Sequence, residues 1–111
     1  MDSYDQLLDS IERAKNSGIF MNCEIFCNLV IGGDKSFKEI YHKVIVNSIS
    51  YPDLKRGDII GFGHPDNIRH YAIYMGDSKV YEVEGFGESA RENNLSNVLD
   101  IYETIGVVYK K

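Results

Sequence analysis

The sequence has no run of apolar residues approaching the ~20 that a bilayer-spanning helix needs, which excludes an integral membrane segment. Its first ten residues, MDSYDQLLDS, lack the basic start, apolar stretch and small-residue cleavage site of a secretory signal. We therefore expect a cytoplasmic protein, or a mature form whose leader is not included. Repeats and low-complexity tracts are also missing, and residues 1–111 are expected to form one domain.

Metal-ligating residues are few and poorly spaced. The chain has two cysteines and three histidines, and the histidines His42, His64 and His70 are scattered, without CxxC or HxxxH spacing. We expect no metal site and no other cofactor. A disulfide between Cys23 and Cys27 would be strained along one helix face, so both are expected to be free thiols.

Positive charge is also scarce. The chain carries 12 Lys and Arg against 17 Asp and Glu, a formal net charge of −5, and the two signs are interspersed. Nothing resembles the basic face that nucleic-acid binding requires, so a nucleic-acid partner is excluded. No pattern specifies an oligomeric state.

Apolar residues at helical spacing predict three helices in the first half of the chain. The first covers residues 3–18 and begins with Ser3 and Gln6 as a capping box. The second opens at residue 22 or 23, with Asn22 as its N-cap, and ends at 32–33. The third is expected over 36–44.

From residue 58 the period changes to that of strands. Three short runs rich in β-branched and aromatic residues are bounded by glycine, and a fourth closes the chain: DIIGFG (58–63), RHYAIYMG (69–76), KVYEVEG (79–85) and IGVVYK (105–110). GDS (76–78) predicts a hairpin turn. A polar loop follows, and 94–102 suits a short helix or turn. Helices first and strands second predict an α+β fold with an antiparallel sheet.

The two cysteines occupy different positions in the second predicted helix. Cys23 lies in the first turn, where unpaired backbone N–H groups and the positive end of the helix dipole lower a thiol pKa. Cys27 lies one turn further on, where that effect has decayed. Cys23 is therefore the candidate nucleophile and Cys27 a core residue.

A histidine and a carboxylate are spaced to serve such a thiol. His70 opens the second predicted strand, and Glu82 has the same parity on the next strand, so the hairpin should place them roughly opposite each other. Glu82 could then accept one imidazole N–H and fix the tautomer, as an orienting carboxylate does in other triads. Glu84 shares the parity and is the substitute candidate, while His64 is a weaker candidate base.

NCEIF at 22–26, LKRGDIIGF at 54–62 and HYAIYMGDSKVYEVEG at 70–85 together resemble the NlpC-like branch of papain-fold cysteine hydrolases. The resemblance covers roughly residues 20–86. It implies a papain-like fold, with amino-terminal helices packed on a small antiparallel sheet. It also implies that Cys23 is the nucleophile, His70 the general base and Glu82 the orienting residue.

The same motifs also resemble the lecithin:retinol acyltransferase-like branch, which shares NCE and a similar histidine strand. Members of that branch are circularly permuted, whereas here the cysteine precedes the histidine. The unpermuted order favours hydrolysis of an amide or peptide bond. A lipid-type acyl hydrolase or acyltransferase, acting on an ester or thioester, is the alternative, and an inactive binding module of the same fold is the third.

The implied mechanism passes through a thioacyl enzyme formed from a peptide, amide or acyl substrate. The backbone N–H of Cys23 would stabilise the oxyanion, with Asn22, Tyr4 and Tyr71 as candidates for a second donor. A peptidase predicts a narrow polar cleft beside Cys23. An acyl hydrolase predicts an exposed apolar groove there.

Overall fold

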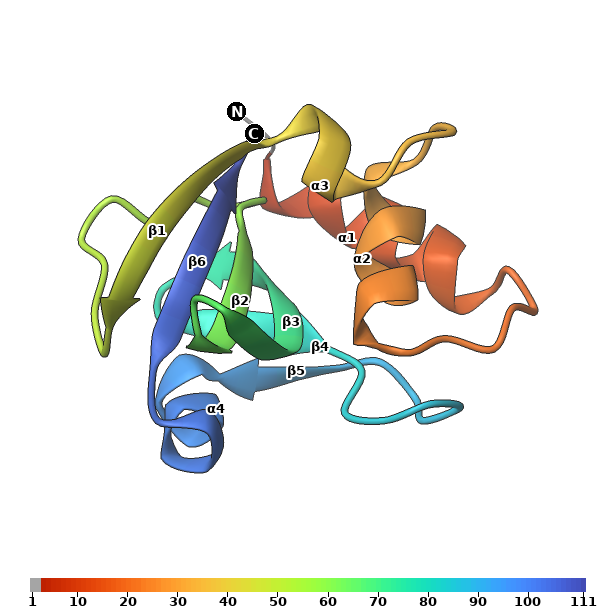
Figure 1. Ribbon diagram of the computed structural model, residues 1–111. Coiled ribbons are helices and arrows are strands. Elements are labelled where there is room, and N and C mark those ends of the chain that lie inside the picture. The colour runs from red at the N-terminus through yellow and green to blue at the C-terminus, as the bar shows by residue number, and fades with distance from the viewer. Residues whose placement is uncertain (1–2) are drawn as a thin grey trace.

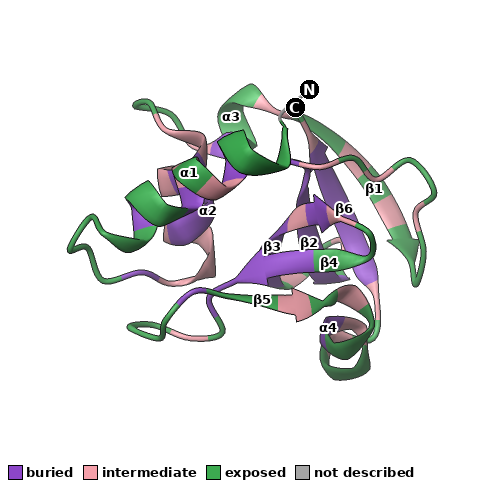
Figure 2. Ribbon diagram, turned by 180° about the vertical axis from the view of Figure 1, so that it is seen from behind, coloured by how far each residue is buried: buried purple, intermediate pink, exposed green. Residues whose placement is uncertain are grey.

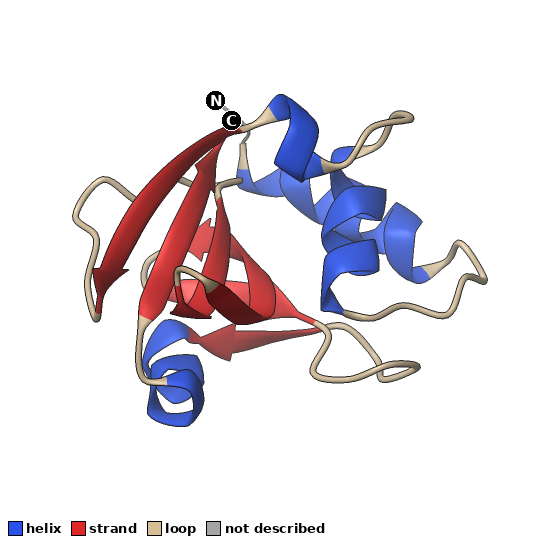
Figure 3. Ribbon diagram, in the orientation of Figure 1, coloured by secondary structure: helices blue, strands red, loops and turns tan. Residues whose placement is uncertain are grey.

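Three helices precede a six-stranded antiparallel sheet, and a fourth helix is inserted before the last strand (Figure 1). The structure, a computed structural model, describes residues 3–111. The elements are α1 (Tyr4–Lys15), α2 (Cys23–Ile31), α3 (Phe37–Ile40), β1 (His42–Ser48), β2 (Ile59–His64), β3 (Asn67–Gly76), β4 (Lys79–Glu82), β5 (Arg91–Asn94), α4 (Leu95–Tyr102) and β6 (Ile105–Lys110). Helices α1–α3 lie on one side of the sheet and α4 at its opposite end (Figure 3). The predicted α+β class with an antiparallel sheet is confirmed.

The strand order β1-β6-β2-β3-β4-β5 places the hairpin strands β3 and β4 side by side. Asp77 and Ser78 form the two-residue turn with φ of 50° and 59°, the left-handed values that a type I′ hairpin turn requires. The predicted hairpin is therefore confirmed. Ile73 pairs with Tyr81, so continuing this register puts Glu82 opposite residue 72. Glu82 shares the face of His70 as predicted, but lies diagonally from it instead of directly opposite.

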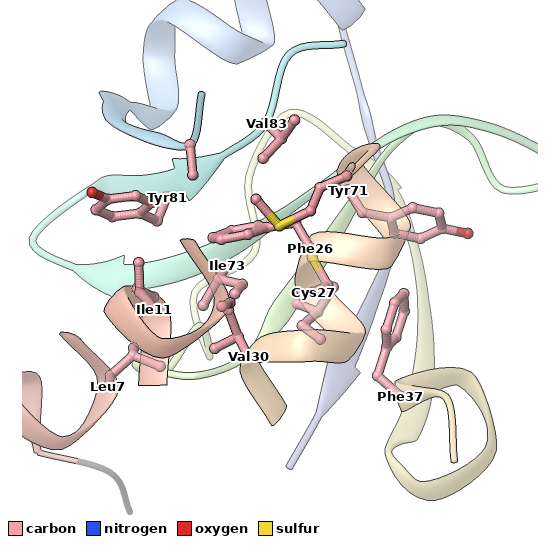
Figure 4. Packing of buried hydrophobic residues seen from close by; sticks show 14 of the residues in the cluster. Leu7, Ile11, Phe26, Cys27, Val30, Phe37, Tyr71, Ile73, Tyr81 and Val83 are labelled. Atoms are coloured by element: carbon pink, nitrogen blue, oxygen red, sulfur yellow. The ribbon is translucent and has the colours of Figure 1, made fainter. Parts of the chain in front are cut away.

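The central strands β2, β3, β4 and β6 have buried residues on both faces, whereas the edge strands β1 and β5 are mostly exposed (Figure 2). The helix-side core joins α1–α3 to one face (Figure 4), and its members include Leu7, Ile11, Phe26, Cys27, Val30, Phe37, Tyr71, Ile73, Tyr81 and Val83. The α4-side core covers the other face and consists of Ile60, Phe62, Ala72, Val80, Val98, Ile105 and Val108. Alternation along the strands therefore decides which side chains reach which core.

The helix starts follow from their caps. The Ser3 hydroxyl accepts the N–H of Gln6, and the Gln6 side chain accepts the N–H of Ser3, which forms the predicted capping box. Asn22 caps α2 as predicted, through a 2.8 Å bond from the Ile25 N–H to its Oδ1. These local bonds determine where the first residue of α2 lies.

Two elements differ from the prediction. The helix expected over 36–44 ends at Ile40, and the residues after it form β1, which pairs antiparallel with β6. The β-branched run Val44–Ile45–Val46 suits a strand, and the free edge of β6 satisfies its backbone groups. Residues 91–94, expected in a polar loop, form β5 on the edge of β4. Their sequence, RENN, has no apolar alternation that would predict a strand.

Phe37 tests the helix-side core. Its fully buried ring packs edge-on against Tyr71 and Tyr109, with ring centroids 5.2 and 5.0 Å away. We expect Phe37→Ala to lower the free energy of unfolding by about 3–5 kcal/mol, because it removes buried area and leaves a cavity. Urea denaturation measures this. Ile49→Ala, at a 71% exposed position, is the control and should change stability by less than about 0.5 kcal/mol. Equal effects would contradict the packing.

Candidate active site

Helix α2 places the Cys23 side chain at its own N-terminus. Asn22 has extended backbone angles, φ −98° and ψ −178°, and the helix begins at the next residue. The first N–H groups of a helix have no intrahelical partner, so they and the helix dipole favour negative charge there. Cys23 is half-buried and accessible, as a nucleophile must be.

The surroundings of the Cys23 sulfur favour its thiolate. Burial acts to raise the pKa of the thiol, but hydrogen bonds from the His70 side chain and from the backbone N–H groups of Tyr71 and Glu24 outweigh it. The net result is a pKa below the ordinary value. Tyr71 lies beyond the part of β3 that pairs with β4, so its backbone can serve the sulfur there.

His70 and Glu82 form a buried pair beside this thiol. Their Nε2 and Oε1 atoms lie 2.7 Å apart, and each residue is only 2% exposed. Because Nε2 faces the carboxylate, Nδ1 is the ring nitrogen left for Cys23. Burial acts to lower the pKa of His70, but the contacts with Cys23 and Glu82 prevail and raise the pKa to about 9. The geometry therefore favours a thiolate–imidazolium pair.

The second oxygen of Glu82 is held as well. The Asn93 side-chain amide donates from Nδ2 to Glu82 Oε2 at 2.8 Å. Burial acts to raise the pKa of Glu82, yet the hydrogen bonds from His70 and Asn93 keep the pKa below its usual value. The substitute candidate Glu84 is exposed and pairs instead with Arg91. The structure thus brings Glu82, and not Glu84, to the histidine.

An aromatic ring covers the imidazole. Tyr102, the last residue of α4, stacks on His70 with centroids 4.9 Å apart and planes at 10°. Phe62 packs against both rings, with its centroid 5.9 Å from that of His70 and 6.2 Å from that of Tyr102. Sequence reasoning missed both Tyr102 and Asn93. Each comes from a segment expected to be a loop or short helix, and no local pattern tied these segments to His70.

The three candidate oxyanion donors lie in different places. Asn22 adjoins Cys23 and uses Oδ1 for its cap. The Tyr71 ring belongs to the helix-side core, so its backbone N–H is what reaches Cys23. Tyr4 is not brought to this cluster, because its hydroxyl donates to Glu92 at 3.3 Å beside the β3–β4 hairpin end. The packing of α1 on the core sets that position, which sequence spacing could not predict.

The remaining cysteine and histidines lie apart from this cluster. Cys27 is fully buried in the helix-side core, and burial raises the pKa of its thiol well above the ordinary value. His64 is exposed beside Asp66, and His42 is exposed on β1. The two cysteines therefore lie in different surroundings, Cys23 at the start of α2 and Cys27 in the helix-side core.

Two loops with exposed aromatic rings flank the site. Residues 16–22 lead into Cys23, residues 83–90 follow Glu82, and the two loops lie side by side in Figure 1, joined by a 2.9 Å bond from the Gly87 N–H to the Met21 carbonyl. Phe20 and Phe86, 72% and 70% exposed, stack with centroids 5.8 Å apart. A hollow of about 270 Å³ lies along the loops beside Phe20.

Residues 3–111 contain no group of three His, Cys, Asp or Glu side chains that could hold a metal ion. Within the same residues, no helix is long and apolar enough to cross a membrane.

Two solved structures described as NlpC/p60 proteins share this arrangement of helices and strands. The NlpC/p60 domain of the peptidoglycan hydrolase SagA superposes with a TM-score of 0.66 at 16% identity, over 99% of this chain and 100% of that chain. An NlpC/p60 family protein from Bacillus cereus gives 0.60 at 17% identity, over 99% of this chain and 40% of that one. The fold is papain-like. Searches of protein-family models and of curated proteins find no match.

Differential thiol labelling tests this site. We expect iodoacetamide at pH 6.5 to alkylate Cys23 at least about tenfold faster than Cys27, because the pKa of Cys23 is lowered while that of Cys27 is raised. His70→Ala should slow labelling of Cys23 and move its midpoint to higher pH. Peptide mass spectrometry of quenched samples measures both rates. Equal labelling of the two cysteines would contradict the assignment.

Proposed function

We propose that the protein is a cysteine hydrolase that cleaves an amide or peptide bond, with Cys23 as nucleophile, His70 as acid and base, and Glu82 as the orienting carboxylate. The observation that carries this proposal is the buried His70–Glu82 pair, 2.7 Å apart, hydrogen-bonded onward to the thiol at the start of α2. A buried charged pair is costly unless it is used or fully bonded, and perturbed titratable groups cluster at functional sites.

Acylation follows from this arrangement. The Cys23 thiolate attacks the substrate carbonyl carbon. The resulting oxyanion accepts a hydrogen bond from the Cys23 backbone N–H at the helix N-terminus. Asn22 is the best placed of the three candidates for a second donor, since its cap uses Oδ1 and leaves the Nδ2 amide. The carbon–nitrogen bond breaks as His70 gives its Nδ1 proton to the leaving amine, which leaves a thioester on Cys23.

Deacylation reverses the roles. Neutral His70 takes a proton from water, the hydroxide attacks the thioester carbonyl, and the sulfur leaves as thiolate while the acid product departs. Glu82 keeps the imidazole oriented through both steps. The fold likeness to the domain of a peptidoglycan hydrolase supports an amide or peptide substrate.

The pH dependence of turnover tests the proposal. We expect activity on short peptides and amides to rise as Cys23 ionises and to fall as the pH passes about 9, where His70 loses the proton that the leaving amine needs. Glu82→Gln removes the charge that stabilises the imidazolium, so the falling limb should move to lower pH and kcat should drop about 10²-fold. Retained activity in Cys23→Ala would contradict the mechanism. Inactivity on every substrate together with unreactive Cys23 would favour a binding module.

A lipid-type acyl hydrolase or acyltransferase is the second candidate, and the exposed Phe20–Phe86 pair favours it. An exposed apolar surface next to the nucleophile is what an acyl chain requires. The rings lie on the two loops that adjoin Cys23 and Glu82, and Ile19, half of whose surface is exposed, adds to the same patch. The chemistry at Cys23 would be unchanged, with an alcohol or thiol leaving in place of an amine.

A chain-length series separates the two candidates. If the substrate is an acyl group, kcat/KM on p-nitrophenyl esters should rise about two- to fourfold per added CH₂, since each buried CH₂ contributes up to ~0.8 kcal/mol. The double variant Phe20→Ser/Phe86→Ser should flatten that series. Ile45→Ser, at a 67% exposed position on β1, is the matched control and should leave it unchanged. A flat series in the unmodified protein, with peptides cleaved, would exclude the acyl alternative.

A further inference from the structure

Asn93 is hydrogen-bonded to the carboxylate oxygen of Glu82 that the proposed triad does not use. A carboxylate whose outer oxygen is unbonded can rotate about its last torsion and carry its partner with it. Glu82 Oε1 holds His70, while Oε2 receives the Asn93 Nδ2 amide at 2.8 Å. Both oxygens of this buried carboxylate are therefore bonded, one to the imidazole and one to the amide.

The orientation of the Asn93 amide is itself determined. Its Oδ1 accepts the backbone N–H of Asn94 at 2.8 Å and the Asn97 Nδ2 at 3.0 Å. A backbone N–H can only donate, so the atom that it meets is the oxygen and Nδ2 is the group that faces Glu82. A flipped amide would set an oxygen against the carboxylate and an N–H against the Asn94 N–H, and would lose both hydrogen bonds.

The sheet register explains why Asn93 reaches this position. Asn93 pairs with Val80 across the β4–β5 ladder and Glu82 pairs with Arg91, so Asn93 and Glu82 share one face and are diagonal neighbours. That face is the one on which His70 lies, next to Phe62 of the α4-side core. Asn97 follows one turn into α4, which ties Asn93 to the helix that also carries Tyr102.

We infer that Asn93 is a positioning residue for the reaction, in which its amide fixes the Glu82 carboxylate so that Glu82 holds His70 toward Cys23. This inference rests on the proposed function. Asn93 touches neither the thiol nor the place where a substrate would meet it, so it acts through Glu82. The amide also donates a hydrogen bond to the charged form of the carboxylate, which lowers the pKa of Glu82 and keeps it ionised at lower pH.

Charged groups around Glu82 also influence the pKa of its carboxyl group. Besides His70 on β3, the Arg91 guanidinium on β5 favours the carboxylate. Cys23 on α2 and Tyr102 on α4 lie near enough for their charged forms to interact with the site. The amide of Asn93 is uncharged, so replacing it changes the hydrogen bond without changing this set of charges.

The decisive experiment compares Asn93→Ala with Asn94→Ala in the full chain. Asn94 is the adjacent residue, is exposed and makes no side-chain cap bond, so it is a matched control. Without the amide, the Glu82 carboxylate loses the hydrogen bond that fixes it and holds the His70 imidazolium less well. We expect the midpoint of Cys23 alkylation to move upward by about half to one pH unit in Asn93→Ala, a threefold to tenfold loss of reactivity below the midpoint.

Turnover gives a second measurement. Asn93→Ala should lower kcat several-fold and leave KM within about twofold, because the residue does not touch substrate. Asn97→Ala, at an exposed position on α4, loosens the Asn93 amide without touching Glu82 and should shift both readouts in the same direction by less. This second variant still tests the role of Asn93 if thermal melting shows that Asn93→Ala folds poorly.

His70→Ala run in parallel separates the two levels of the proposal. If His70→Ala slows alkylation but Asn93→Ala and Asn97→Ala match Asn94→Ala, the role of Asn93 is wrong and the proposed function stands. If His70→Ala has no effect, the proposed function fails. A lowered melting temperature with an unchanged pH profile would make Asn93 a purely structural residue and would also overturn the inference.

Discussion

The structure depends on one costly interaction, the buried His70–Glu82 pair. Taking an imidazolium and a carboxylate out of water costs several kcal/mol per ion, and only good geometry with every polar atom bonded offsets it. Both carboxylate oxygens are bonded, and the residues described, 3–111, include no buried side-chain nitrogen or oxygen without a partner. The hairpin turn, the β4–β5 ladder and the cap of α2 each supply one part of that arrangement.

The pair also joins two cores that are otherwise separate. His70 and Glu82 lie on the sheet face of the α4-side core, where Phe62 and Tyr102 both pack against the imidazole. Cys23 comes from α2, which packs on the helix-side core. The thiol and the imidazole therefore come from opposite sides of β3 and meet where its pairing with β4 has ended. Packing on both faces of the sheet holds the thiol and the imidazole in place relative to each other.

Environment, and not residue type, makes the two cysteines different. Cys23 and Cys27 are one helical turn apart, yet one lies at the helix N-terminus beside a histidine and the other among apolar side chains. The same burial that keeps Cys27 protonated is overcome at Cys23 by hydrogen bonds that act only on the charged form. A thiol at a helix N-terminus beside a histidine ionises more readily than one buried among apolar groups, so the two positions favour different protonation states.

The sequence by itself determined those features that depend on hydrogen bonds between residues close together in the chain. Three short-range features belong here. They are the capping box at Ser3, the Asn22 cap that places Cys23 at a helix N-terminus, and the Asp77–Ser78 turn that puts His70 and Glu82 on one face. Only the tertiary structure decided the rest. Strands β1 and β5 form by pairing with the edges of β6 and β4. Asn93 and Tyr102 reach the surroundings of His70 through pairing and packing between distant segments. Local periodicity carries no information about such contacts, because their free energy arises only when the segments meet.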